Sequence, residues 1–454
     1  MPHSSIVHDL RSAHSADALL TGVPLPTLLY FALPIILGNI FQQLYSIVDA
    51  IVVGNFLGDL PLSGISVASP IVDVANALVI GGTIGVGVLC AHYCGAGEGE
   101  RLRCMNATAL LGGGALTLLI ALCGIFFSTP LLRAQGTEEA VCREAAVYLQ
   151  LVFAGLLFCF LYNYYAAMLR SYGNSRTPFL ILLLSSTLHA LLDVLFVGVF
   201  GWGIRGVAFS TVLCQALAAA ACILYAQRRC PPLLLRPANL RFDRQMARLV
   251  LSYAWAAALQ QAVVCIGRLL VQGMLTPLGT STVTGYNMSL RTEQFLFCFS
   301  QGISAAMVVC LSQNLGHGDR PRARRFFRIS VLVELALIAL LGTVCFLFPA
   351  RIVGLFSDNA DVIAAGAQYT GAMAYLYVFA YLGEVIQGFF RGLGRLRLTM
   401  VASLLQVLLR VVLSYLLIPV WGMYGICAAV VSGWVLLVGI EGAYAVRKSS
   451  ALAA

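Results

Sequence analysis

The chain contains 454 residues, of which 60% are hydrophobic and only 10% are charged, and its formal net charge at pH 7 is +9. Soluble domains usually contain about 25% charged residues, so this composition excludes an ordinary soluble protein. The basic residues stand in short segments along the whole chain rather than in one stripe, which argues against nucleic acid as a partner.

Apolar segments follow one another from residue 27 to residue 446. Many reach the ~20 residues that an α-helix needs to cross ~30 Å of hydrocarbon. The polar first residues lead into an apolar segment too long for the core of a signal peptide, so no cleaved leader is expected. The sequence therefore predicts an all-α membrane protein with twelve transmembrane helices, near residues 27–53, 64–93, 105–128, 146–170, 178–200, 204–227, 247–275, 283–313, 326–348, 365–390, 397–419 and 424–446.

The distribution of arginine and lysine predicts how these helices are oriented. If the N-terminus lies inside, 21 of the 28 basic residues fall in inner loops, four fall in outer loops and three lie inside helices. Cytoplasmic loops of membrane proteins carry the excess of basic residues. We therefore expect a multi-pass protein of the cell membrane with both termini in the cytoplasm.

The chain also repeats itself at a shift of 221 residues. The shift aligns Gly-Ala-Gly-Glu at 95–98 with Gly-His-Gly-Asp at 316–319, and Arg170 with Arg391. Two halves of six helices enter the membrane from the same side, which predicts a pseudo-two-fold axis along the membrane normal and a cleft suited to alternating access. The predicted parts are a cytoplasmic segment at 1–26, an N-lobe at 27–228, a basic linker at 229–246, a C-lobe at 247–447 and a tail at 448–454.

Ionisable side chains in the N-lobe predict a cation site. Counting ~1.5 Å per helical residue, Asp49, Asp193, Thr211 and Tyr148 all fall in the outer half of the membrane. His189 lies one turn from Asp193 on the same helix face. Carboxylates that share a low-dielectric site hold protons, and their oxygens also suit hard cations. Either aspartate could instead satisfy polar groups of a neighbouring helix, and Thr211 could bond only to the carbonyl one turn earlier.

Two further N-lobe residues are candidates for the substrate cleft or its gate. Pro34 removes a backbone hydrogen bond from the first predicted helix, which predicts a kink fifteen residues before Asp49. The kink could act as a hinge or only serve packing. Asn163 lies much deeper in the fourth predicted helix than Tyr148 and is the second candidate.

The C-lobe departs from the N-lobe at this site. The repeat places Leu270 at the position of Asp49 and Arg410 at that of His189. The predicted cation site is therefore asymmetric.

The C-lobe offers its own charged candidates for the cleft. Arg291 and Glu293 lie two residues apart in the eighth predicted helix, and Glu384 lies near Gln387 in the tenth. A desolvated carboxylate at Glu384 would attract organic cations. Internal ion pairs are the alternative for Glu293 and Glu334.

Nothing in the sequence predicts an enzyme. The 14 cysteines follow no metal-site or disulfide spacing, and no motif of a nucleophilic or metal-dependent enzyme is present. We expect no cofactor and no resident metal, with Na⁺ at Asp49, Asp193 and Thr211 as the alternative to a proton.

Six motifs follow one another across residues 24–447. They are Ala-Leu-Pro at 32–34, Gln-Gln-Leu-Tyr-Ser-Ile-Val-Asp-Ala-Ile-Val-Val-Gly at 42–54, Gly-Ala-Gly-Glu at 95–98, Leu-Arg-Ser-Tyr-Gly-Asn-Ser-Arg-Thr-Pro at 169–178, Gly-Trp-Gly-Ile-Arg-Gly-Val-Ala at 201–208 and Arg-Gly-Leu-Gly at 391–394. In this order and spacing the chain resembles the multidrug and toxic compound extrusion (MATE) family, on the bacterial branch that includes DNA-damage-inducible-type members.

The resemblance implies an antiporter that exports amphipathic, often cationic compounds, driven by inward flow of H⁺ or Na⁺. It also implies that the family's cation site falls on Asp49, Tyr148, Asp193 and Thr211. The family usually has asparagine at the position of His189. Because imidazole titrates near neutrality and is a poor ligand for Na⁺, this departure favours proton coupling. The expected partners are small amphipathic substrates and membrane lipid, and we expect the chain to function as a monomer.

Other functions remain open at this stage. A flippase for lipid-linked precursors, from the related superfamily, would use cations such as Arg268, Arg291 and Arg410 to bind phosphates. A channel or receptor is a third possibility, which saturable transport against a gradient would exclude.

Overall fold

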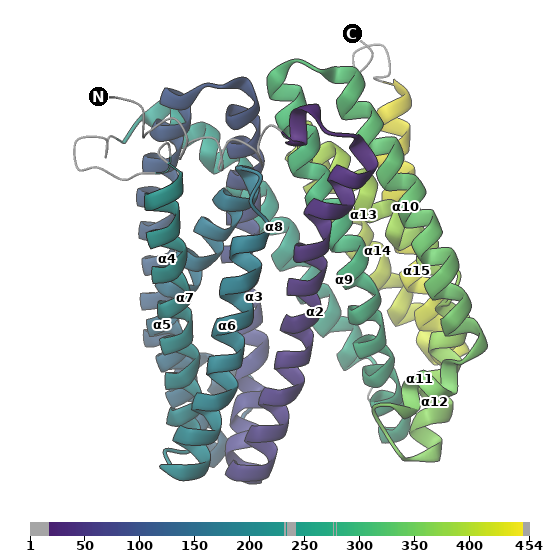
Figure 1. Cartoon of the computed structure of the whole chain (residues 1–454). Helices are drawn as coiled ribbons and strands as arrows, with labels where there is room; N and C mark the ends of the chain where they lie inside the picture. Colours follow the sequence, from purple (N-terminus) through teal and green to yellow (C-terminus); the bar gives the residue numbers. More distant parts are fainter. Residues whose placement is uncertain (1–17, 231–232, 234–241, 276, 278, 448–454) are drawn as a thin grey trace. The chain divides into compact units, whose positions relative to one another are not determined.

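The structure is a computed structural model that describes residues 18–230, 233, 242–275, 277 and 279–447 (Figure 1). Most of the predicted N-terminal segment and basic linker, and the whole predicted tail, lie outside the described residues. Within the helices, six side chains are also outside the description: Tyr45, Val48, Asp49, Ala50, Asp59 and Val446.

All regular elements of the described residues are helical, as predicted. Eleven described helices are long and apolar enough to span a membrane, and one bent pair of helices makes a twelfth span. The elements are α2 (Pro24–Leu57), α3 (Asp59–Ala96), α4 (Gly99–Ala134), α5 (Glu139–Ser171), α6 (Arg176–Asp193), the π-helix η1 (Val194–Val199), α7 (Ile204–Arg229), α8 (Arg244–Gly273), α9 (Thr280–His317), α10 (Arg320–Leu347), α11 (Pro349–Gly354), α12 (Ala360–Met373), α13 (Tyr377–Gly392), α14 (Leu396–Trp421) and α15 (Met423–Arg447).

The helices form two compact units, which we describe separately. The first comprises Met1–Gly22, Leu33–Ala258 and Ser312–Asp319, and the second comprises Val23–Ala32, Leu259–Leu311 and Arg320–Ala454. One boundary between the units falls in α2 between Ala32 and Leu33, one residue before Pro34. The helix runs through Pro34 without a break in its assignment, so the predicted kink stays a prediction.

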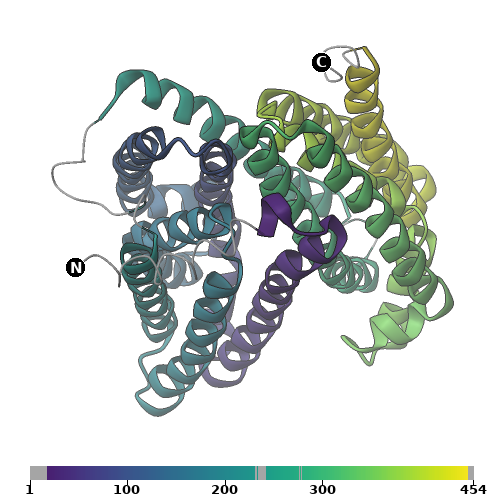
Figure 2. The same cartoon turned by 45° about the horizontal axis from the view of Figure 1, so that its top comes forward.

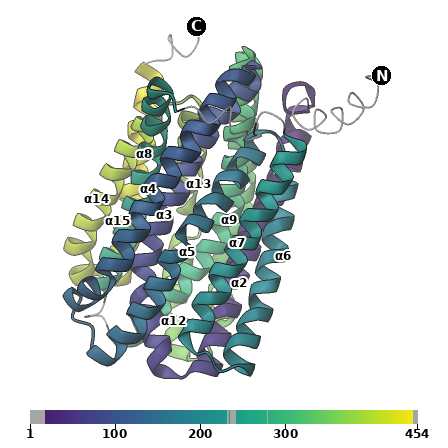
Figure 3. The same ribbon diagram turned by 90° about the vertical axis from the view of Figure 1, so that its left-hand side faces the viewer.

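α5 is the central helix of the first unit, because it packs against α3, α4 and α7. Figure 3 shows these helices and α6 as long rods running beside one another. Their shared core is apolar and aromatic, and it includes Phe153, Phe160 and Tyr164. The buried Tyr164 hydroxyl donates to Asn106 Oδ1 of α4 at 2.7 Å, so the polar tip of this large side chain is satisfied inside the core.

Glycines of the first unit allow α3 to cross the end of α9 closely. A Cβ atom on Gly95 would overlap the backbone of Gln313, and one on Gly316 would overlap the carbonyl of His92. Gly95 and Gly316 are the same position in the two halves of the sequence repeat. Gln313 also donates from Nε2 to the Ser171 carbonyl at 2.7 Å, which ties the end of α9 to α5.

The second unit contains the bulk of α9 and all of α10 to α15. Figures 1 and 2 both show α14 and α15 side by side, coloured light green to yellow. Four fully buried tyrosines stand at the centre of its core: Tyr286, Tyr369, Tyr377 and Tyr381.

The internal repeat is visible in the backbone of both units. Gly97 ends α3 with φ of 70°, and Gly318, 221 residues later, follows α9 with φ of 90°. The positions Gly173 and Gly394 repeat this pattern, with φ of 89° and 73°. Since this left-handed conformation costs a residue with a Cβ atom about 1–2 kcal/mol, the same helix ends are specified by glycine twice.

The prediction of one continuous helix at 365–390 is wrong. This segment is formed by α12 and α13, whose axes are bent by 58° around residues 374–376. Gly342 of α10 lets the backbone approach closely there, because a Cβ atom on it would lie 2.8 Å from the Ala374 carbonyl oxygen. Tyr375 also contacts Thr343 through its hydroxyl at 3.2 Å. Neighbours from another helix therefore favour the break, and the segment itself contains no proline.

Candidate cation-coupling site

Asp193 is the last residue of α6 and is fully buried. The chain continues from it into the π-helix η1, which widens the turn directly after the carboxyl. Short π-helical stretches within α-helices occur frequently at functional sites. A buried carboxyl at such a turn inside a membrane span is a candidate site for a transported cation.

His189 lies one turn before Asp193 and is also buried. Its Nδ1 is 2.8 Å from Asp193 Oδ2, and its Nε2 is 2.9 Å from Thr211 Oγ1 of α7. Both ring nitrogens therefore have a polar neighbour. The helical spacing of four residues predicted the first contact, and the packing of α6 on α7 supplies the second.

α7 contributes two adjacent hydroxyls to the site. Ser210 donates from Oγ to Asp193 Oδ1, and it also lies 2.8 Å from the Val207 carbonyl of its own helix. Thr211 donates to the same carbonyl at 2.8 Å. Thr211 thus bonds to the carbonyl one turn earlier and contacts His189 as well.

These contacts constrain where protons can reside. A hydroxyl has one proton, so a Thr211 hydroxyl that donates to Val207 must accept from His189 Nε2–H. His189 Nδ1 lies 2.8 Å from Asp193 Oδ2, close enough for a proton carried by either group to lie between them. The proton can belong to an imidazolium beside a carboxylate or to a carboxylic acid beside a neutral imidazole. The close approach of an imidazole and a carboxyl makes this pair a candidate for holding a proton.

A buried apolar cluster lies one turn along the chain from these residues. Val53, Val197 and Val207 form it along α2, η1 and α7, and Tyr148 of α5 packs against it. Burial of His189 and Asp193 strengthens the interaction between their charged forms and makes loss of one partner costly. Among the described residues, no group of three histidine, cysteine, aspartate or glutamate side chains is arranged to hold a metal ion.

The structure brings together three of the five predicted cation-site residues, Asp193, His189 and Thr211. Tyr148 lies in the adjacent apolar cluster. Asp49 belongs to α2, but its side chain lies outside the described part of the chain. Sequence reasoning missed Ser210, although the adjacent hydroxyls of residues 210 and 211 were a visible signal.

Asn163 does not join this group. Its side-chain amide donates to the Cys159 carbonyl of α5, one turn earlier, at 2.9 Å. Cys159 in turn contacts Asn76 Oδ1 of α3 at 3.6 Å. The predicted role of Asn163 in a substrate cleft stays a prediction.

In the second unit, Glu293 of α9 is buried among tyrosines. Its Oε2 lies 3.3 Å from the Tyr377 hydroxyl and 3.5 Å from the Tyr369 hydroxyl. Arg291 is exposed on the same helix, and neither Glu293 nor Glu334 takes part in the ion pairs found among the described residues. Arg410 nevertheless acts electrostatically on Glu293, so a charge pair inside the protein stays the alternative for Glu293.

Glu384 has a fixed counter-ion. Arg391, two turns later in α13, donates to Glu384 Oε1 at 2.5 Å. Gln387 points into a buried polar network instead, where it accepts from Gln260 at 2.9 Å and donates to Ser403 at 2.7 Å. Any organic cation attracted by Glu384 must therefore compete with Arg391.

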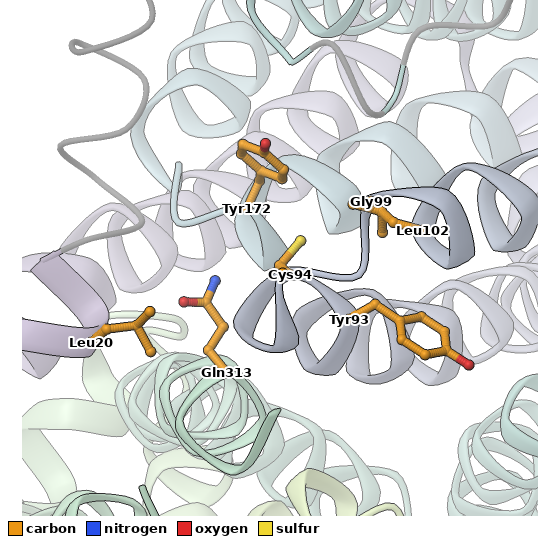
Figure 4. Close-up of a pocket in the computed structure, with 8 residues that line it drawn as sticks. Leu20, Tyr93, Cys94, Gly99, Leu102, Tyr172 and Gln313 are labelled. Carbon is orange, nitrogen blue, oxygen red and sulfur yellow. The ribbon is translucent and has the colours of Figure 1, made fainter. Parts of the chain in front are cut away.

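The first unit also contains a cavity of roughly 200 Å³ (Figure 4). Tyr93 and Cys94 of α3, Tyr172 and Gln313 line it. Tyr172 precedes the start of α6, whereas Asp193 ends that helix, roughly 25 Å further along its axis. The cavity is therefore separate from the cation-coupling site.

Twelve candidate spans, a repeat carried by the backbone and a buried histidine–aspartate pair inside one span are together typical of a multi-pass membrane transporter. The model of the MatE family matches residues 34–195 and again residues 256–416, one match in each half, and the chain belongs to this family. The resemblance found in the sequence is thereby confirmed.

Individual relatives are distant but cover most of the chain. The chain is 27% identical over 387 residues to "Probable multidrug resistance protein YpnP" of Bacillus subtilis (strain 168), over 85% of this chain and 86% of that protein. It is 26% identical over 346 residues to "FAD transporter" of Shewanella oneidensis, over 74% of this chain and 75% of that protein. A solved MOP superfamily transporter from Pyrococcus furiosus has the same fold, with a TM-score of 0.87 at 19% identity, over 96% of this chain and 98% of that chain.

Proposed function

We propose that the chain is a proton-coupled antiporter that exports amphipathic, often cationic drugs and toxic compounds across the cell membrane by alternating access. Membership of the MatE family and similarity to a relative named as a multidrug resistance protein support the class of transport. The single observation that carries the choice of coupling ion is the buried contact between His189 and Asp193, at 2.8 Å, which supports a shared proton.

The mechanism requires only that two conformations differ in their affinity for this proton. With the proton bound, the pair is neutral overall. Loss of the proton leaves one net negative charge in a buried site, which costs several kcal/mol unless the site opens or rearranges. Proton binding from outside then favours release of the substrate, and substrate binding from inside favours release of the proton, because coupling between two sites is reciprocal.

Sodium is the less favoured coupling ion. Na⁺ prefers several oxygen ligands, whereas one Asp193 oxygen accepts from Ser210 and the other faces a ring nitrogen of His189. A sodium site would need the Asp49 carboxylate to join the group. Asp49, Tyr148 and Thr211 remain proposed members of the coupling site on the strength of the resemblance.

The remaining features of the proposal follow from the sequence. The excess of basic residues in alternate loops supports cytoplasmic termini and insertion in the cell membrane. We further propose that the chain acts as a monomer in contact with membrane lipid and without a cofactor, so that the coupling ion is the transported partner of the substrate.

The test is efflux of ethidium from cells that express the chain, under an imposed pH gradient and separately under an imposed Na⁺ gradient. We expect wild-type efflux to follow the pH gradient and Asp193→Asn to fall to the level of cells without the protein. Asp358→Asn, at an exposed position, is the matched control and should retain efflux. Full efflux by Asp193→Asn, or a requirement for Na⁺ with no response to pH, would refute proton coupling at this site.

A second candidate substrate class rests on the similarity to a protein named as an FAD transporter. That cargo is aromatic and anionic, and the exposed Arg268 and Arg291 carry the complementary charge. The same cells distinguish the candidates if flavin in the medium is measured beside ethidium. Export of flavin without export of the dye would replace cationic drugs by anionic dinucleotides as the substrate class.

A further inference from the structure

Two fully buried glutamates of the second unit take no part in the proposed function. Glu334 of α10 and Glu441 of α15 both have 0% exposed surface. All four of their carboxyl oxygens lack a hydrogen-bond partner among the described residues. The hydroxyl of Ser300, also buried, approaches the Glu334 carboxyl from α9 without forming a hydrogen bond of normal geometry.

An ionised carboxylate in such a place would be costly. Burial of an unpaired charge costs several kcal/mol even after relaxation, and no donor in the described structure offsets this for Glu334 or Glu441. A protonated carboxyl avoids the penalty, because the acid is neutral. Among the described residues, these carboxyls belong to no group of three or more histidine, cysteine, aspartate or glutamate side chains placed to hold a metal ion.

A partly exposed ion pair lies within electrostatic range of the two glutamates. Glu384 of α13 interacts electrostatically with both Glu334 and Glu441, and Arg391 interacts with Glu441. The side chains of Glu384 and Arg391 are 24% and 13% exposed, unlike the glutamates on either side. The titratable and charged groups that act on the buried carboxyls are therefore Glu384, Arg391 and, beside Glu334, Tyr381.

We propose that Glu334 and Glu441 form a second proton-binding site, in which each carboxyl holds an exchangeable proton and the Glu384–Arg391 pair passes protons to and from the surface. Each transfer breaks an O–H bond on one carboxyl and forms one on the Glu384 carboxylate or on water. The site goes beyond the proposed function, which uses only the first unit. Its place in α10, α13 and α15 gives the second unit a proton site of its own.

The test is infrared spectroscopy of the purified full-length protein in lipid nanodiscs, read at the carbonyl stretch of protonated carboxyl groups. We expect a band near neutral pH that shifts in heavy water and disappears reversibly as the pH is raised. Glu334→Gln and Glu441→Gln should each remove a separate part of it. Glu100→Gln is the matched control, because Glu100 has an 89% exposed side chain and should leave the band unchanged.

The variant Glu384→Gln tests the Glu384–Arg391 pair. It leaves Arg391 facing Glu441 without its own counter-ion, so the part of the band that belongs to Glu441 should disappear at lower pH than in the wild type. A band that neither glutamine substitution reduces, or whose Glu334 and Glu441 parts never titrate or exchange, would overturn the proposal. Asp193→Asn separates this result from the proposed function, because it should abolish efflux while leaving the Glu334 and Glu441 parts of the band in place.

Discussion

The two units carry different chemistry at positions that the internal repeat aligns. In the first unit these positions hold His189 and Asp193, in contact at 2.8 Å. In the second they hold Arg410 and Ser414, both buried. An imidazole and a carboxyl can exchange a proton near neutral pH, whereas a guanidinium stays charged and a serine hydroxyl stays neutral.

The backbone of the two units does not show this difference. Left-handed glycines end the corresponding helices in both halves, at Gly97 and Gly318 and again at Gly173 and Gly394. The repeat therefore conserves the scaffold and not the site. In the second unit a fixed positive charge at Arg410 acts on Glu293, which is surrounded by phenols, so this group is suited to structure rather than to coupling.

The largest expected effect on stability comes from removing that fixed charge. Arg410→Gln leaves Glu293 buried without its main cation, and the free energy of unfolding should fall by about 3 kcal/mol. The measurement is thermal unfolding in detergent, followed by tryptophan fluorescence. Arg205→Gln, at an exposed position, is the control and should change little. If instead Arg410→Gln is as stable as the wild type and loses only pH-driven efflux, the second unit takes part in coupling at this position.

His189→Asn tests the matching position of the first unit. The amide can donate to Asp193 but cannot take up a proton, so pH-driven ethidium efflux should fall about tenfold, which corresponds to ~1.4 kcal/mol. The dependence of the initial rate on external pH should become flatter. The exposed His317 provides the control substitution His317→Asn. An unchanged pH profile in His189→Asn would mean that Asp193 alone holds the coupling proton.

His189 and Asp193 show how much of the site the sequence could reveal. Two ionisable residues four apart in an apolar segment must lie on one helix face, and this local rule needs no tertiary information. Ser210 was harder to find, because its role depends on how α7 packs on α6. Glu441 stands near the end of a predicted helix, and only its burial in the structure separates it from an ordinary interfacial glutamate.

The fold also has features that the sequence predicts and features that depend on contacts between distant segments. Span number and repeat follow from hydropathy and spacing, and all twelve predicted helices overlap helices of the structure. The break between α12 and α13 could not be predicted from hydropathy and spacing, because the residues that favour it, Gly342 and Thr343, belong to α10. Contacts between distant segments are the part that a single sequence does not contain.

A smaller effect is expected from the hydroxyls of α7. Ser210→Ala removes the donor to Asp193 Oδ1 and should cost about 1 kcal/mol, with a severalfold slower pH-driven efflux. Ser252→Ala is the control, because Ser252 bonds only to the Leu249 carbonyl of its own helix among the contacts described. Efflux rates measured at equal expression would settle the comparison. Identical rates for Ser210→Ala and the wild type would remove Ser210 from the coupling site.

The smallest effects on stability are expected at the left-handed glycines that end corresponding helices in the two units. Gly97→Ala and Gly318→Ala each force a Cβ atom into the left-handed region and should each lower the free energy of unfolding by about 1 kcal/mol. Gly112→Ala, inside α4 with open space around it, should be neutral or slightly stabilising. Thermal unfolding of the three variants checks this, and pH-driven efflux should change in none of them. Equal losses of unfolding free energy in Gly97→Ala and Gly318→Ala would support a scaffold that the same local rule specifies in both halves. A loss in only one of these variants would mean that different contacts maintain the two helix ends.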